Sequence, residues 1–86
     1  MKKRTIKLAH LVLTIERNDS GFLARCPTIE GAFAEGETVA EAIFNCVDVV
    51  RMILDYRKER GETVPEGILE EMPANREISF SIPIEV

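Results

Sequence analysis

The chain has 86 residues, of which 45% are hydrophobic and 30% are charged. That length suffices for one domain, 1–86, and the composition excludes a disordered chain. The formal net charge of −4 argues against nonspecific binding to nucleic acid and suits a basic partner. No apolar run approaches the length of a membrane span. The basic residues 2–4 are not followed by the apolar run of a signal peptide, so the sequence predicts a cytoplasmic protein.

The first predicted element is a strand over residues 5–17, in which the alternation of apolar residues slips partway. The apolar residues fall into two sets of opposite parity, Ile6 with Leu8, and Leu11 with Leu13 and Ile15. A bulge near Ala9–His10 would bring both sets onto one face of the sheet. Alternatively, both faces are partly buried, which in a sheet with one helix implies a partner subunit.

A strong turn signal follows at Asn18–Gly21, where short polar side chains precede a glycine. A second strand over 22–26 then closes a hairpin. Pro27 ends that strand or marks a bulge, because proline cannot donate to a ladder. A third short strand is predicted over 32–35, between two glycines.

The clearest helix signal spans residues 39–60. Thr38 and Glu41 have the spacing of a capping box, in which a hydroxyl and a carboxylate each accept a bond from an otherwise unpaired backbone N–H. Gly61 comes directly after basic residues, which is typical of a helix C-terminus. Apolar residues recur between these ends at three- and four-residue steps and form one stripe: Val39, Ile43, Cys46, Val47, Val50, Ile53 and Leu54.

Residues 62–75 are predicted to be a connector, because Pro65, Gly67 and Pro73 interrupt any regular pattern. A last strand is predicted over 77–84, where apolar residues alternate with serine or proline. The predicted fold is therefore α+β with the order β-β-β-α-β. It is an antiparallel meander with one long helix packed on one face and a returning C-terminal strand. A crossover through the helix would place that strand parallel to a neighbour.

No catalytic or metal-binding set of residues is recognisable, so we expect neither an enzyme nor a cofactor. His10 lies within the predicted first strand without a recognisable partner. Cys26 and Cys46 match no metal-ligand spacing and are interpreted as reduced core residues. Two basic groups, residues 2–4 and the cations near the end of the predicted helix, lack interleaved aromatics and a second recognition helix, so binding to DNA is not expected. Three glutamates gather near the predicted helix start, where the helix dipole explains them better than a metal does: Glu35, Glu37 and Glu41.

Residues 21–45 read GFLARCPTIEGAFAEGETVAEAIFN. This run resembles the HicB-like antitoxin family, of the UPF0150 type, whose pattern joins a glycine-to-proline stretch, two spaced glycines and G-[DE]-T-x-x-E-A-x-x-N. The resemblance extends loosely to about residue 65, over half the chain. Turns, a strand end and a helix cap account for most of the motif, so its role is interpreted as mainly structural. The matching positions are Gly21, Pro27, Gly31, Gly36, Glu37, Thr38, Glu41, Ala42 and Asn45.

The resemblance implies a partial RNase H-like fold without the RNase H carboxylate cluster. It also implies protein binding, because HicB-like antitoxins bind and mask a small basic mRNA-cleaving toxin and commonly assemble as dimers or tetramers. Many of them carry a C-terminal DNA-binding segment. After Gly61 this chain has only the connector and the last predicted strand, so no separate DNA-binding domain is expected.

Three functions follow as hypotheses. The first is a module that binds a cognate toxin-like protein through an acidic surface. The second is an orphan homo-oligomeric scaffold of the same fold without a toxin partner, suggested by the two-faced strand 5–17 and the small core. The third, an RNA-processing enzyme, depends on His10 alone. The acidic surface of the first hypothesis is formed by Glu30, Glu35, Glu37 and Glu41.

Overall fold

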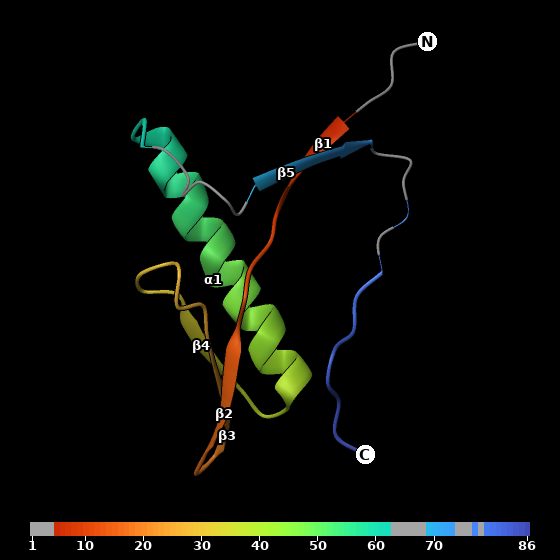
Figure 1. Cartoon of the computed structure of the whole chain (residues 1–86). Helices are drawn as coiled ribbons and strands as arrows, with labels where there is room; N and C mark the ends of the chain where they lie inside the picture. Colours follow the sequence, from red (N-terminus) through yellow and green to blue (C-terminus); the bar gives the residue numbers. More distant parts are fainter. Residues whose placement is uncertain (1–4, 63–68, 74–76, 78) are drawn as a thin grey trace.

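The structure, a computed structural model, describes residues 5–62, 69–73, 77 and 79–86. The described part is α+β, with short strands and one long helix (Figure 1). In chain order the elements are β1 (Thr5–Ala9), β2 (Thr14–Asn18), β3 (Gly21–Arg25), β4 (Phe33–Gly36), α1 (Val39–Glu59) and β5 (Leu69–Pro73).

β2, β3 and β4 form an antiparallel sheet in that order, which confirms the predicted meander. Asn18 pairs with Gly21, so β2 and β3 are joined by a two-residue turn. The Oδ1 atom of Asn18 accepts a hydrogen bond from the N–H of Ser20 at 3.1 Å, which is how asparagine favours turns. One row of residues crosses all three strands and packs toward the helix: Ile15, Ala24 and Ala34.

The segment between β3 and β4 folds back into the core. β3 ends at Arg25, two residues before Pro27, as a proline at that point requires. The N–H of Cys26 donates to the carbonyl of Ala32 at 2.9 Å, and the N–H of Ile29 donates to the carbonyl of Cys26 at 3.0 Å. These bonds close a compact loop that buries Ile29, which is 1% exposed. Ile29 belongs to no periodic pattern, so the sequence did not indicate its burial.

The helix begins at the predicted residue and ends within one residue of the predicted end. Its fully buried residues are small or medium in size, namely Ala42, Cys46 and Val50. Ile53 and Leu54 are partly buried beside them. The predicted apolar stripe is therefore confirmed in part: the four of these residues that belong to it pack in the core between helix and sheet, whereas Val39, Ile43 and Val47 are only partly buried outside the core cluster. Ala42, which the stripe left out, is fully buried.

The C-terminus of α1 is closed by a glycine in the left-handed region. Gly61 has φ +75°, its N–H donates to the carbonyl of Lys58 at 3.0 Å, and the N–H of Glu62 donates to the carbonyl of Arg57 at 2.8 Å. This pair of bonds is a Schellman motif, which satisfies carbonyls that the helix leaves without a partner. Gly61 thus ends the helix as its position in the sequence predicts.

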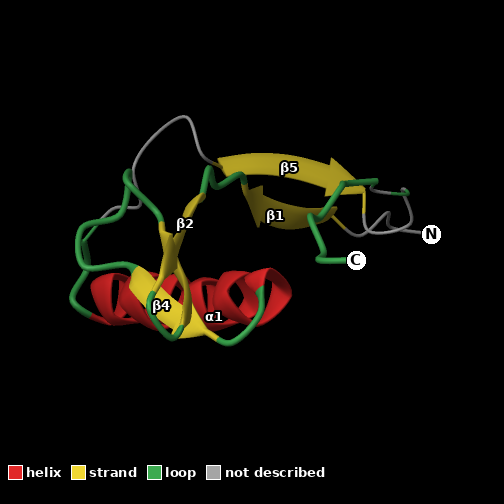
Figure 2. Cartoon of the chain, turned by 90° about the horizontal axis from the view of Figure 1, so that it is seen from below, coloured by secondary structure: helices red, strands yellow, loops and turns green. Residues whose placement is uncertain are grey.

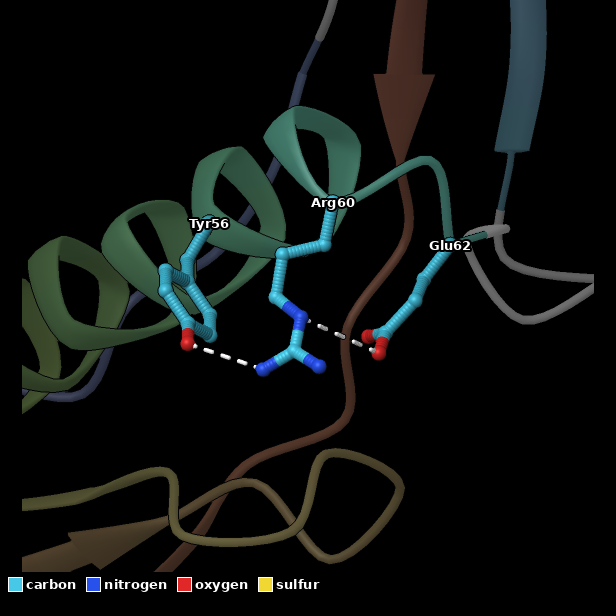
Figure 3. Close-up of polar contacts among 3 residues, drawn as sticks. All are labelled: Tyr56, Arg60 and Glu62. Carbon is cyan, nitrogen blue, oxygen red and sulfur yellow. Dashed lines mark hydrogen bonds and ion pairs between the residues drawn. The ribbon is translucent and has the colours of Figure 1, made fainter.

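A small polar cluster lies on the surface of this helix end (Figure 3). The Nη1 atom of Arg60 donates to the hydroxyl of Tyr56 at 3.0 Å, and its Nε atom lies 3.8 Å from Oε1 of Glu62. The guanidinium also lies 5.5 Å from the centre of the Tyr56 ring. Because the side chains of Arg60 and Glu62 are 59% and 51% exposed, this pair stabilises the fold by at most about 1 kcal/mol.

β1 and β5 form a separate antiparallel ribbon, in register from Thr5↔Pro73 to Ala9↔Leu69. Within the described residues, the ribbon packs against neither α1 nor the β2–β4 sheet. Figures 1 and 2 show it set apart from the helix and sheet.

The prediction of one strand over residues 5–17 was wrong. β1 and β2 belong to different sheets, and residues 10–13 join them without a bulge or a ladder. The physical reason is the length of the neighbouring strand: β3 ends at Arg25, opposite Thr14, so the preceding residues have no neighbour in that sheet. His10 is accordingly an exposed residue of the connection rather than part of a strand.

The predicted C-terminal strand over 77–84 was also wrong. The described residues of this range, 77 and 79–84, belong to no strand, and Phe80 is 81% exposed. The last strand is instead β5, inside the predicted connector, and it runs antiparallel to β1. Alternation alone does not make a strand, because a strand needs a neighbour whose N–H and C=O groups complete the ladder. Residues 63–68, 74–76 and 78, with Pro65 and Gly67, lie outside the described residues.

Gly36 is the position where the sheet approaches the helix most tightly. A Cβ atom there would lie 2.8 Å from the backbone C of Glu41 and 2.9 Å from Cα of Ala42, too close for any real contact. We therefore expect Gly36→Ala to destabilise the protein by roughly 2 kcal/mol or more, because the helix backbone must move. Urea denaturation followed by circular dichroism measures this loss.

Gly31→Ala is the matched control. Gly31 has φ +82° but open space around its Cα, so the added methyl group costs only about 1 kcal/mol of backbone strain. Equal losses for the two variants would contradict the proposed contact between β4 and α1.

Candidate functional site

The start of α1 is an acidic, hydrogen-bonded corner of the molecule. The hydroxyl of Thr38 accepts the N–H of Glu41 at 3.1 Å, so Thr38 is the N-cap. The reciprocal bond of the predicted capping box is shifted by one residue. Oε1 of Glu41 accepts the N–H of Glu37 at 3.2 Å rather than that of Thr38. Two backbone donors are still satisfied, and a carboxylate lies at the positive end of the helix dipole.

A second carboxylate reaches this corner from the far end of the chain. Oε1 of Glu85 accepts the N–H of Val39, the first residue of the helix, at 3.2 Å. The two residues are 46 positions apart, so no local sequence signal indicates this contact. The C-terminal segment therefore ends beside the helix start, as Figure 1 shows.

An open cleft of about 470 Å³ lies between the β2–β3 turn and the helix start. Asp19, Glu37 and Glu85 supply carboxylates to it, and Arg17 supplies a guanidinium. The remaining lining residues are Asn18, Ser20, Gly21 and Phe22. We call the four carboxylates of this corner the acidic helix-start surface: Asp19, Glu37, Glu41 and Glu85.

The structure does not gather all four glutamates that the sequence suggested. Glu37 and Glu41 lie together at the helix start. Ala34 and Gly36 face the helix, so Glu35, between them in β4, points to the opposite face of the sheet. Glu30 lies in the loop before β4, at the other end of that strand. Instead of Glu30 and Glu35, the corner contains Asp19 and Glu85. The sequence did not indicate that these two carboxylates meet there.

The remaining motif residues shape the backbone around this corner. Nδ2 of Asn45 donates to the carbonyl of Glu35 at 2.9 Å and so ties the helix to β4. Ala42 is fully buried, and its N–H donates to the carbonyl of Thr38 at 3.0 Å. Gly21 pairs with Asn18 at the end of the hairpin and lies against the backbone of Gly36. These contacts position the cleft and leave the exposed carboxylates as its chemical groups.

The other groups considered in the sequence do not join this corner. His10 lies in the β1–β2 connection, outside the cleft lining. Among the described residues, no three His, Cys, Asp or Glu side chains gather in a way that would hold a metal ion. No described helix is both long and apolar enough to cross a membrane. The basic residues 2–4 lie outside the described part of the chain.

The two cysteines are free and buried in the core. Burial, with a smaller effect from Cys26, raises the pKa of the Cys46 thiol. The Sγ atom of Cys46 lies 3.9 Å from the carbonyl oxygen of Ala32. A buried thiol that stays protonated is a poor nucleophile, so Cys46 acts as a core residue.

Thr38→Ala removes the N-cap hydroxyl and leaves the N–H of Glu41 without its partner. We expect a loss of about 1 kcal/mol in the free energy of unfolding, measured by urea denaturation. Thr14→Ala, at an exposed strand position, is the control and should change stability by less than about 0.5 kcal/mol. A Thr38→Ala protein as stable as wild type would show that Glu85 and Glu41 suffice to cap the helix.

The raised pKa of the Cys46 thiol should make the free energy of unfolding depend on pH. Its pKa is raised in the folded state above the ordinary value of 9.0, so its contribution is fully present below that pH. The contribution is lost as pH rises further, because the unfolded chain gains thiolate that the folded chain does not. We expect the free energy of unfolding to fall less steeply above that pH in Cys46→Ala than in wild type. Parallel slopes for the two proteins would contradict the shift.

Known proteins provide a further comparison. The chain is 39% identical to UPF0150 protein ssl0738 of Synechocystis over 67 residues, which cover 73% of this chain and 90% of that protein. It is 25% identical to UPF0150 protein Ta0767 of Thermoplasma acidophilum over 65 residues, which cover 76% of this chain and 94% of that protein. No family model and no solved structure matches the chain. The extent and identity of the match to the Synechocystis protein show that this chain belongs to the UPF0150 family.

Proposed function

We propose that this protein is a HicB-like binding module that masks a small basic, mRNA-cleaving toxin-like protein and has no catalytic activity of its own. Membership of the UPF0150 family and the motif over residues 21–45 support this proposal. They also support a partial RNase H-like arrangement of the meander and helix. The binding surface is assigned to the acidic helix-start surface because carboxylates from three separate segments gather there.

The geometry of this surface suits a basic protein. Its carboxylates come from three separate segments, the β2–β3 turn, the helix start and the C-terminal end. Three of them, Asp19, Glu37 and Glu85, line one open cleft together with the single cation Arg17. The fourth, Glu41, lies beside the cleft at the helix start. An open cleft admits a lysine or arginine side chain from a partner while the carboxylates stay partly hydrated. Opposite charges on two proteins raise the rate of encounter and fix their orientation more than they raise affinity.

Part of this charge has a structural role, and the two roles can be separated. Glu41 and Glu85 accept backbone hydrogen bonds of the helix start, so changing them alters the fold as well as the surface. Asp19 and Glu37 line the cleft, and their carboxylates cap no helix N–H among the hydrogen bonds described. Asp19 and Glu37 are therefore the residues with which to test partner binding.

The test uses the product of the small gene adjacent to this one. We expect it to co-purify with the wild-type protein, and we expect Asp19→Lys with Glu37→Lys to weaken the complex by about tenfold or more through repulsion of a basic partner. Asp48→Lys with Asp55→Lys is the matched control, because it makes the same charge change on the exposed face of α1. Circular dichroism checks that each variant is folded.

Growth gives a second readout if the neighbouring product is toxic. Co-expressed wild-type and control proteins should then restore growth, whereas the Asp19 and Glu37 variant should not. Equal protection by all three proteins would overturn the choice of surface. The absence of any basic protein partner would overturn the toxin-masking function itself.

A second candidate is an oligomeric scaffold that acts without a toxin. The observation that favours it is the β1–β5 ribbon, which lies outside the core formed by helix and sheet. The growth experiment separates the two functions. A scaffold without a toxin partner would not restore growth, whether as wild type or as either variant.

A further inference from the structure

Residues 79–86 have the alternation of a strand but belong to no sheet of this chain. Apolar residues occupy every second position, with serine or proline between them: Ser79, Phe80, Ser81, Ile82, Pro83 and Ile84. The segment adopts no helix, strand or turn, and Phe80 and Ile84 are 81% and 66% exposed. Backbone groups of a strand-like segment that join no ladder can pair with a strand of another chain. The segment is therefore a candidate contact surface.

The segment lies next to the acidic helix-start surface. Among the described residues, one hydrogen bond ties it to the rest of the fold, from the N–H of Val39 to Oε1 of Glu85 at 3.2 Å. This bond places the end of the segment beside the start of α1, as Figure 1 shows. In strand conformation, residues 79–84 span about 20 Å. A protein bound at the acidic helix-start surface therefore has the segment within reach.

Pro83 decides which edge of this segment can pair. In an antiparallel ladder, the N–H and C=O groups of one residue point to the same edge, and those of the next residue point to the other edge. Phe80, Ile82 and Ile84 present a complete set of donors and acceptors on one edge. The other edge is interrupted, because Pro83 has no N–H. The segment thus suits the outermost position of a sheet, with one neighbour only.

The charge of the segment selects the kind of neighbour. Residues 79–84 are uncharged, but Glu77 and Glu85 flank them. A second copy of this chain brings the same net charge of −4, whereas a basic protein brings the opposite sign. Cations of a basic protein can pair with the flanking glutamates and with the acidic helix-start surface at the same time. The sheet edge that fits this segment is therefore one on a basic protein.

We propose that residues 79–84 add as an edge strand to a free sheet edge of the basic partner. Backbone hydrogen bonds from the edge of Phe80, Ile82 and Ile84 hold the strand, and these apolar side chains pack on the partner. The inference rests on the proposed function and adds a second, short-range contact to it. Charge at the acidic helix-start surface speeds association, whereas the added strand slows dissociation.

Binding kinetics of the full chain with the product of the adjacent small gene test this assignment. Ile82→Pro removes an N–H from the pairing edge, so we expect dissociation about tenfold faster or more, with association changed by less than about twofold. Ser81→Pro is the matched control, because it removes an N–H from the edge that Pro83 already interrupts, and it should leave dissociation unchanged. Ile82→Ala keeps the N–H and should dissociate more slowly than Ile82→Pro. All three positions lie outside the core, so circular dichroism should show an unchanged helix.

Hydrogen exchange gives a second readout. In the complex we expect the amides of Phe80, Ile82 and Ile84 to be protected, while those of Ser79 and Ser81 exchange freely. Protection of the same amides without the partner would overturn the assignment, because the neighbour would then be this chain or a second copy. A complex whose dissociation Ile82→Pro leaves unchanged would overturn the added strand and leave the proposed function standing. The absence of any complex would overturn both.

Discussion

The fold depends on one close approach, where the end of β4 lies directly against the backbone of α1. Gly36 leaves no room for a side chain there, and the fully buried Ala42 is the helix residue opposite it. This contact lets a helix of 21 residues lie flat on a sheet of only three short strands. The small residues Ala24 and Ala34 continue the same narrow interface across the sheet. Because the space between helix and sheet is narrow, most buried core residues are small. The largest of them, Ile29, enters the core from the loop between β3 and β4.

The same approach fixes where charge can collect. The chain passes from β4 into the helix within two residues, so the helix start lies at the edge of the sheet, next to the β2–β3 turn. Backbone N–H groups that lack helical partners face this edge and attract carboxylates. Glu41 and Glu85 satisfy two of these donors. Asp19 and Glu37 add charge that no helix end requires, and that surplus is why we assign partner binding to this corner.

Among the described residues the molecule also has a second, separate sheet, in which β1 and β5 pair with each other. The core lies between α1 and the β2–β4 sheet, while Phe33, Phe44 and Met52 of that body stay exposed. Within the part of the chain that the structure describes, the ribbon contacts neither α1 nor the β2–β4 sheet, so it lies apart from the acidic helix-start surface.

The sequence alone determined the helix, its two ends and the hairpin, because each has a signal within a few residues: the Thr38 cap, the Gly61 termination and the Asn18–Gly21 turn. The motif glycines and Pro27 likewise act on their own backbone. The tertiary structure decided which strands pair, where the 5–17 segment divides, and which carboxylates meet, including Glu85 from 46 residues away. Alternation shows that a segment can be a strand but not which neighbour completes its ladder. That choice is made by the lengths and ends of other strands, which no local pattern contains.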